Sequence, residues 1–180
     1  MNFCSHCGAT VKSMIPEGDT RLRAVCSACN TIHYSNPKVV AGTLPTWGDR
    51  VLLCRRAIEP RKGYWTLPAG YLENHESIVD GARRETQEEA NAKLNELQLY
   101  TVFSLPHISQ VYVFFRGPLD RPEFSSGEES LEVALFSEPD IPWDKLAFPV
   151  VTDTLEHYFR DRKEAAFPVH YAEINFPKRR

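Results

Sequence analysis

The carboxylates best placed for chemistry lie in one stretch, GYLENHESIVDGARRETQEEA, which begins at Gly70. Glu85, Glu88 and Glu89 are spaced so that on a helix they would be neighbours and would repel one another. The repulsion grows as the surroundings become less polar, and a divalent cation would relieve it. Hard oxygen ligands favour Mg²⁺ or Mn²⁺, and Mg²⁺ commonly shares its coordination sphere with phosphate oxygens. The stretch therefore predicts a metal site for a phosphate ester or anhydride.

The same stretch has the pattern of a helix. Ser77 and Asp80 have the spacing of a capping box, so the helix should begin at Ile78, and Asn91 can adopt the left-handed conformation that ends it. At ~100° per residue, the first and last of the three glutamates continue the apolar line from Ile78. An ordinary solvated helix would carry its glutamates on the opposite face. We therefore expect partly buried carboxylates.

Arg84 could hold these carboxylates in position. It lies one helical turn before Glu88 and could pair with it, or it could reach back to Glu76 before the helix. Gly81, in the middle of the helix, costs ~1 kcal/mol relative to alanine. A close approach by another part of the backbone would explain this glycine.

Four of the five cysteines form two CxxC pairs. The pairs are Cys4 with Cys7 and Cys26 with Cys29. This spacing predicts a closed tetrahedral zinc site of structural type, with disulfides or unused thiols as the alternative. His6 and His33 could replace a cysteine, but we interpret both as ordinary polar residues, and Cys54 as a small buried hydrophobic residue. A segment of about 33 residues has too little core to fold alone, so zinc would stabilise it.

Composition indicates a globular protein with a real core, since 42% of the residues are hydrophobic. No apolar run approaches the ~20 residues of a membrane span, and the start lacks a basic region followed by an apolar one, so we expect a cytoplasmic protein. The formal net charge of −3 and the pI of about 6.1 give no footprint of a general nucleic-acid binder. We expect a small-molecule partner instead.

The rest of the pattern predicts a mixed sheet covered by helices. Strand-like runs at 38–47 and 50–56 flank a WGD turn, and further runs lie near 97–105, 108–117 and 130–137. The segment 150–163 should form an amphipathic helix with Val151 and Leu155 on one side. We place the domains at 1–35 for a zinc ribbon, 36–165 for the main domain and 166–180 for a C-terminal extension.

The acidic stretch resembles the Nudix box of the Nudix hydrolases. Gly70, Glu76 and the run RETQEE from Arg84 match the box, and GYWTLPAGYLE matches the residues that precede it. Thr86 stands where the family usually has an aliphatic residue, and Asn91 where it usually has glycine. The resemblance implies an α/β/α sandwich that hydrolyses a nucleoside diphosphate linked to another group, with the help of divalent ions.

Nearly the whole chain resembles the zinc-ribbon Nudix hydrolases related to the chloroplast ADP-ribose and FAD diphosphatase of plants. The matching segments are the four-cysteine ribbon, NPKVVAG, LLCRRAIEP, LPHISQVYVFFRG and ESLEVALFSEPDIPWDKLAF. A second branch, the NADH diphosphatases, carries SQPWPFP after the box, and the nearest segment here is SLPHISQ. The resemblance thus favours FAD or ADP-ribose over NADH, with AMP as one product, and homodimers are the family's habit.

The resemblance also implies roles for residues of the box. Glu85 and Glu89 should bind the metal ions, Glu88 should be a further ligand or an orienting acid, and the carbonyl of Gly70 is a candidate ligand. Glu76 should pair with Arg84. The proton acceptor would be a box glutamate or one from the later loop.

That later loop offers Glu128, Glu129 and Glu132. We take Glu132 first, because it directly precedes the strand-like run VALF. The alternative is that all three are solvated charges.

Substrate contacts are expected from residues next to the box. Arg55 or Arg56 could reach the diphosphate, or form an exposed ion pair. Aromatic side chains could stack on a ring of the substrate, or belong to the core. These aromatic residues are Tyr64, Trp65, Phe103 and Tyr112.

Other classes of protein remain as alternatives. A zinc ribbon can read nucleic acid, but Lys12, Arg21 and Arg23 are nearly balanced by Glu17 and Asp19. A regulator with this fold would bind ADP-ribose without cleaving it, and a pure binder has no use for the three glutamates. Within the enzymes, NADH or nucleoside triphosphates are the alternative substrates.

Overall fold

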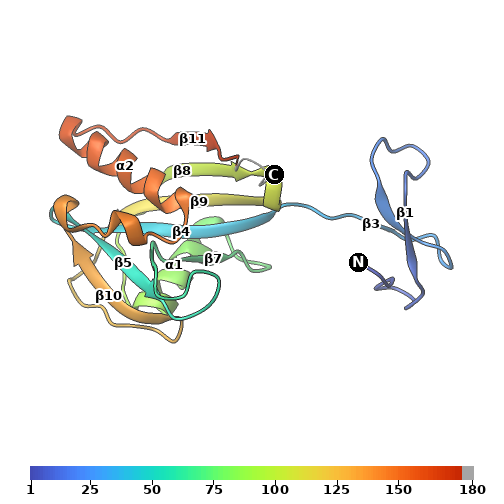
Figure 1. Ribbon diagram of the computed structural model, residues 1–180, viewed down its shortest axis with the longest axis horizontal. Coiled ribbons are helices and arrows are strands. Elements are labelled where there is room, and N and C mark those ends of the chain that lie inside the picture. The colour runs from blue at the N-terminus through green and yellow to red at the C-terminus, as the bar shows by residue number, and fades with distance from the viewer. Residues whose placement is uncertain (176–180) are drawn as a thin grey trace. The chain divides into compact units, whose positions relative to one another are not determined.

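The computed structural model describes residues 1–175 and divides the chain into two compact units, Met1–Asn36 and Pro37–Arg180 (Figure 1). The first unit is a small antiparallel sheet of β1 (Val11–Met14), β2 (Arg23–Cys26) and β3 (Ile32–His33), in the order β1-β2-β3. Two of its few buried residues are cysteines, Cys4 and Cys26. So little apolar burial cannot fold a segment of this size without a further constraint.

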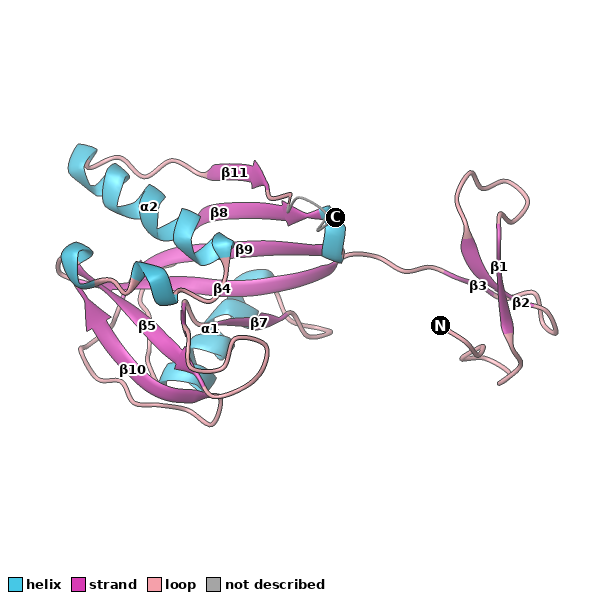
Figure 2. Ribbon diagram, in the orientation of Figure 1, coloured by secondary structure: helices cyan, strands magenta, loops and turns pink. Residues whose placement is uncertain are grey.

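The second unit is built on a mixed sheet (Figure 2). The main path runs β10-β5-β4-β9-β8-β11, with β6 paired to β5 and β7 to β4. The pairs β4–β9 and β11–β8 are parallel, whereas the others are antiparallel. The strands are β4 (Lys38–Trp47), β5 (Arg50–Arg56), β6 (Trp65–Thr66), β7 (Ala69–Tyr71), β8 (Gln98–Leu105), β9 (Gln110–Pro118), β10 (Ser130–Phe136) and β11 (His170–Glu173).

Two helices, α1 (Ile78–Ala90) and α2 (Pro149–Glu164), cover opposite faces of this sheet (Figure 1). Short 3₁₀ turns lie at Pro106–Ile108, Glu138–Asp140 and Trp143–Lys145. Successive side chains of a strand point to opposite faces, so β5 serves two cores. Val51 and Leu53 join the larger core with Leu155 of α2, whereas Leu52 and Cys54 join a smaller core at the end of α1. The predicted α/β/α sandwich with a mixed sheet is confirmed.

The local predictions hold at most elements. The hairpin between 38–47 and 50–56 forms β4 and β5, with Gly48 at φ +59° in the turn. Val151 and Leu155 lie on the buried side of α2, and Cys54 is buried as expected. Ile78 does not follow the prediction, because 38% of it is exposed. Among the described residues, no helix is both long enough and apolar enough to span a bilayer.

The C-terminal segment differs from the predicted extension. His170–Glu173 forms β11, which pairs in parallel with β8 and so belongs to the main sheet. Phe167, Ala172 and Ile174 pack against the larger core. The last five residues of the expected extension lie outside the described part of the chain.

Candidate active site

Helix α1 begins and ends where the sequence predicts. The Ser77 side chain accepts a hydrogen bond from the backbone N–H of Asp80 at 3.2 Å, and Asn91 ends the helix with φ 48°. The helix packs on β4 through a pair of buried hydroxyls: the Oγ1 atoms of Thr43 and Thr86 are 2.6 Å apart. Thr86 also donates to the carbonyl of Ala82 at 2.8 Å. Thr86, which stands where the box usually has an aliphatic residue, thus makes a satisfied hydrogen-bonded contact between helix and sheet.

The glutamates of α1 differ in burial. The Glu85 side chain is 12% exposed and Glu89 is 6% exposed, whereas the Glu88 side chain is 58% exposed. Burial raises the pKa of Glu85, and burial together with the charge of Glu85 raises the pKa of Glu89 to about 8. The two innermost carboxylates are therefore costly to keep charged without a cation.

Gly70 lies directly against one of these carboxylates. A Cβ atom at this position would overlap both carboxylate oxygens of Glu85, so a larger residue would displace that carboxylate. β7 pairs Gly70 with Ala41 of β4, which fixes the Gly70 backbone at this position. Carboxylate and backbone carbonyl oxygens are the ligands that Mg²⁺ or Mn²⁺ prefers. The residues present thus fit a divalent ion.

Arg84 makes both of the contacts that the sequence left open. Its Nη1 donates to Glu85 at 2.7 Å and to Glu88 at 2.9 Å, and its Nη2 donates to Glu76 at 2.8 Å. The bond from Arg84 holds the pKa of Glu76 at about 2. The Glu76 carboxylate also explains Gly81, because a Cβ there would come within 2.8 Å of it. Side chains, and not a backbone segment, therefore lie closest to this glycine.

The loop before β10 is fixed to the end of α1. The N–H of Gly127 donates to the carbonyl of Glu89 at 3.0 Å, and that of Ser125 donates to the carbonyl of Ala90 at 2.9 Å. A Cβ on Gly127 would overlap the backbone oxygen of Glu88, so the approach requires glycine. The loop is thereby held against the carboxylate-bearing end of the helix.

This loop brings Glu129, and not Glu132, to the carboxylates. The charge of Glu129 contributes to the raised pKa values of Glu85 and Glu89. Glu132 instead forms an exposed ion pair with Arg55 at 3.2 Å. Glu132, our first choice as proton acceptor, is thus engaged by Arg55, and its role stays a prediction. Sequence alone named Glu129 only as one of three loop acids.

Arg56 is the substrate-binding candidate that lies near the carboxylates. Its charge lowers the pKa of Glu89 against the effect of burial, its Nε donates to the carbonyl of Pro60 at 2.8 Å, and its guanidinium lies 5.2 Å from the ring centre of Phe148. Tyr64 is half-buried, with the Arg61 guanidinium 5.3 Å from its ring centre. The sequence analysis did not identify Phe148 as a partner of Arg56, because no catalytic motif marks this residue.

Trp65 and Phe103 belong to the larger core. Trp65 packs edge-on against Phe136 with ring centres 4.8 Å apart, and Phe103 is fully buried. Both rings therefore pack in the core, which was the alternative for these aromatic residues, and a substrate contact of Trp65 stays a prediction. Tyr112 is half-buried and stacks with Phe114 at 6.2 Å.

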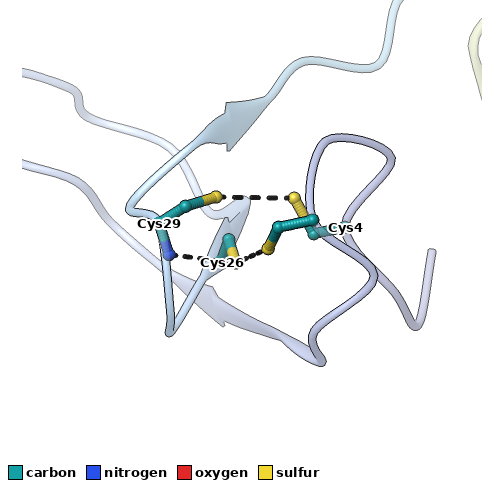
Figure 3. A group of neighbouring side chains, drawn as sticks. Cys4, Cys26 and Cys29 are labelled. Atoms are coloured by element: carbon teal, nitrogen blue, oxygen red, sulfur yellow. Dashed lines mark hydrogen bonds between the residues drawn. The ribbon is translucent and has the colours of Figure 1, made fainter.

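The four paired cysteines converge in the first unit, and Figure 3 labels three of them, Cys4, Cys26 and Cys29. All four sulfur atoms lie within 4.8 Å of one another; Cys4 and Cys29 are 3.7 Å apart, and Cys7 and Cys26 are 3.5 Å apart. Tetrahedral zinc with Zn–S bonds of about 2.3 Å needs sulfur atoms about 3.8 Å apart, so the cluster fits zinc. His33, which we interpreted as an ordinary polar residue, contacts this cluster: its Nε2 lies 3.3 Å from the Cys4 sulfur.

Comparisons with known proteins agree with both units. Residues 36–157 match the NUDIX domain family, and residues 2–35 match the zinc-ribbon family described as Nudix N-terminal. Because the NUDIX match covers more than half of the chain, the protein belongs to the Nudix family and carries an N-terminal zinc-ribbon domain. The predicted family is confirmed.

Relatives of known structure or name support this assignment. A crystal structure of a NUDIX hydrolase from Nitrosomonas europaea is 53% identical, covers 97% of this chain and 100% of that chain, and has a TM-score of 0.90. The human mitochondrial NAD(P)H pyrophosphatase is 37% identical over 54% of this chain and 26% of its own length. The ADP-ribose pyrophosphatase of Methanocaldococcus jannaschii is 27% identical over 64% of this chain and 69% of its own length. The match thus spans about a quarter of the human relative.

Proposed function

We propose that this protein hydrolyses the diphosphate bond of a nucleoside diphosphate linked to another group, with FAD or ADP-ribose as substrate. The observation that carries the proposal is the pair of desolvated carboxylates, Glu85 and Glu89, packed against the Cβ-free backbone of Gly70. Such a pair has surplus negative charge that a divalent ion would neutralise. Bound diphosphate would supply the remaining oxygen ligands.

Each residue of the site has a role in this proposal. Glu85, Glu89 and the carbonyl of Gly70 would hold Mg²⁺ or Mn²⁺, with Glu88 as a further, more exposed ligand. Bound there, the ions would supply an acidified water molecule and would neutralise charge on the diphosphate. Arg84 orients Glu85 and Glu88 and is itself held by Glu76.

Proton transfer is assigned to the loop acid whose charge acts on the buried carboxylates. Glu129 would accept the proton of the attacking water, because its charge acts on both Glu85 and Glu89. Arg56, anchored on Pro60 and stacked on Phe148, would bind a phosphate oxygen. Tyr64 stays a candidate for contact with a ring of the substrate. The products would be AMP with FMN, or AMP with ribose 5-phosphate.

NADH is the second candidate substrate. The similarity to a human NAD(P)H pyrophosphatase favours it, whereas the sequence after the box lacks the SQPWPFP segment of the NADH diphosphatase branch. The name of the archaeal relative supports ADP-ribose. A nucleotide-sensing regulator and a nucleoside triphosphate pyrophosphohydrolase stay as further alternatives.

The experiment that tests the proposal compares substrates in parallel. Purified protein is incubated with FAD, ADP-ribose, NADH and dATP in Mg²⁺, and the products are separated by chromatography. The proposal predicts that AMP forms fastest from FAD or ADP-ribose. Faster turnover of NADH would favour NADH as the substrate. Binding of ADP-ribose without any product would support a nucleotide-sensing regulator.

In this proposal the zinc ribbon has a structural role. Zn²⁺ held by Cys4, Cys7, Cys26 and Cys29 would fix the small sheet. Four free thiolates persist only where disulfides do not form, so we place the protein in a reducing compartment such as the cytoplasm. We also propose a homodimer, with small nucleotides and not nucleic acid as its ligands.

A further inference from the structure

A cavity of about 660 Å³ lies where the end of β9, the start of β8 and the segment after α1 meet. This volume is in the range of sites that bind small molecules. Arg83 of α1, Gln98 of β8 and Arg116 of β9 line it, together with Glu96. None of the carboxylates assigned to the active site takes part, so the cavity is separate from that site.

Arg83 is held rigidly at this cavity. It lies about 200° around α1 from Glu85, so it projects away from the carboxylate site. Its Nη1 donates to the carbonyl of Leu94 at 2.7 Å and its Nη2 to that of Asn95 at 2.9 Å. Carbonyl oxygens fix the guanidinium but leave its full positive charge uncompensated. Within residues 1–175, no carboxylate forms an ion pair with Arg83.

Arg116 supplies the second charge, also fixed and also without a carboxylate partner in the described part of the chain. Its guanidinium lies 3.8 Å from the ring centre of Phe167, and its Nη2 donates to Gln98 at 2.9 Å. Its Nε is buried and has no hydrogen-bond partner among the described residues.

We propose that this cavity is a binding site for a phosphomonoester or inorganic phosphate, held between Arg83 and Arg116. Two immobilised guanidinium groups that line the same cavity match the oxygens of a dianionic phosphate. Glu96, which is exposed on the lining, opposes an anion and keeps the binding weak. The remaining volume accommodates an organic group attached to the phosphate.

The test uses the zinc-loaded full chain, ¹⁵N-labelled and titrated with inorganic phosphate at constant ionic strength in two-dimensional NMR. Saturable shifts are expected at the amides of Asn95 and Gly117. R83Q and R116Q should each weaken the fitted affinity by about tenfold. The matched control R121Q removes an exposed arginine outside the cavity and should leave the affinity unchanged.

A gain of affinity gives independent evidence, because R116Q also removes the contact with Phe167 and could perturb the fold. E96Q at its exposed position should tighten phosphate binding severalfold. Shifts that stay linear to the highest concentration, equal losses in R121Q and R116Q, or unchanged affinity in E96Q would each overturn the proposal. E85Q distinguishes the two sites. It should alter the chemical shifts near Gly70 but leave the phosphate-induced shift changes at Gly117 as in the unmodified protein.

Discussion

Glu85 and Glu89 combine low exposure with close mutual repulsion. Burial is the largest cause of both raised pKa values, and each is raised further by neighbouring acidic charges. Arg84 compensates only part of this charge, because it contacts Glu85, Glu88 and Glu76 but not Glu89. At the scale of single residues, the site is therefore short of positive charge, which is the condition that favours divalent cations.

Replacing Glu85 by glutamine tests this role. E85Q keeps the size of the side chain but removes a charged oxygen ligand, so kcat should fall by about three orders of magnitude while the fold is retained. The measurement is steady-state hydrolysis in Mg²⁺, with circular dichroism as the check on folding. E164Q, an exposed glutamate at the end of α2, is the matched control and should keep its turnover. Near-normal turnover of E85Q would remove Glu85 from the role.

Periodicity could predict the box glutamates but not the loop acid. Glu85, Glu89 and Arg84 lie on one helix, where spacing fixes their relative directions. The choice between Glu129 and Glu132 depends instead on long-range contacts: the loop bonds to the end of α1, and Glu132 pairs with Arg55 across two strands. Spacing along the chain carries no information about such contacts.

At the scale of elements, the packing of α1 on β4 depends on the hydroxyls of Thr43 and Thr86. Both residues are fully buried, and because Thr86 donates to Ala82, Thr43 is the donor to Thr86. A missing partner here would leave a buried hydroxyl without a hydrogen bond. The sequence flagged Thr86 as a departure from the box, but its partner lies 43 residues away.

A double-mutant cycle tests this contact. T86V leaves the Thr43 hydroxyl unsatisfied and should lower the free energy of unfolding by about 1–3 kcal/mol. T43V should cost less, because Thr86 keeps its bond to Ala82. The double variant should recover part of the T86V loss, measured by urea unfolding. Additive losses in the double variant would show that the two hydroxyls do not depend on each other.

Elements with local signals were predictable, whereas β11 was not. Ser77 and Asn91 mark the two ends of α1 within the sequence itself. Strand β11 has four residues and gains its hydrogen bonds from β8, about seventy positions earlier, so no local pattern distinguishes it from an extension.

At the scale of the whole molecule, the proposal assigns separate metal sites to the two units. C4S should lower zinc content and unfold the small sheet, because three sulfur ligands no longer close the tetrahedral site. Turnover at the glutamate site should survive, since no ribbon residue belongs to it. Elemental analysis and hydrolysis of the same sample make the comparison. C54S is the control and should keep its zinc; unchanged zinc in C4S would contradict the four-sulfur site.

Asp161 ties α2 to the two strands β8 and β11. Tyr100 donates to it at 2.8 Å, and Nε2 of His170 lies 2.5 Å from it. Burial would raise the pKa of Asp161, but these hydrogen bonds outweigh burial and lower it below 3.8. A lowered folded pKa means that the charged form stabilises the fold above the unfolded pKa.

This linkage predicts how stability changes with pH. The free energy of unfolding should exceed that of D161N by a constant amount above about pH 5, and the difference should shrink as pH falls below 3.8 towards the lowered pKa. Urea unfolding of both proteins between pH 3 and 7 gives the comparison. A difference that grows on acidification would contradict the assignment.

We propose that Glu85 and Glu89 on the buried face of α1 bind divalent ions, which in turn bind a diphosphate. Crystals grown with Mn²⁺ and a non-hydrolysable ADP-ribose analogue test it through anomalous diffraction. The account predicts an Mn²⁺ peak at about 2.0–2.2 Å from carboxylate oxygens of Glu85 and Glu89, next to the analogue's diphosphate. Analogue bound without any Mn²⁺ peak at these glutamates would contradict it.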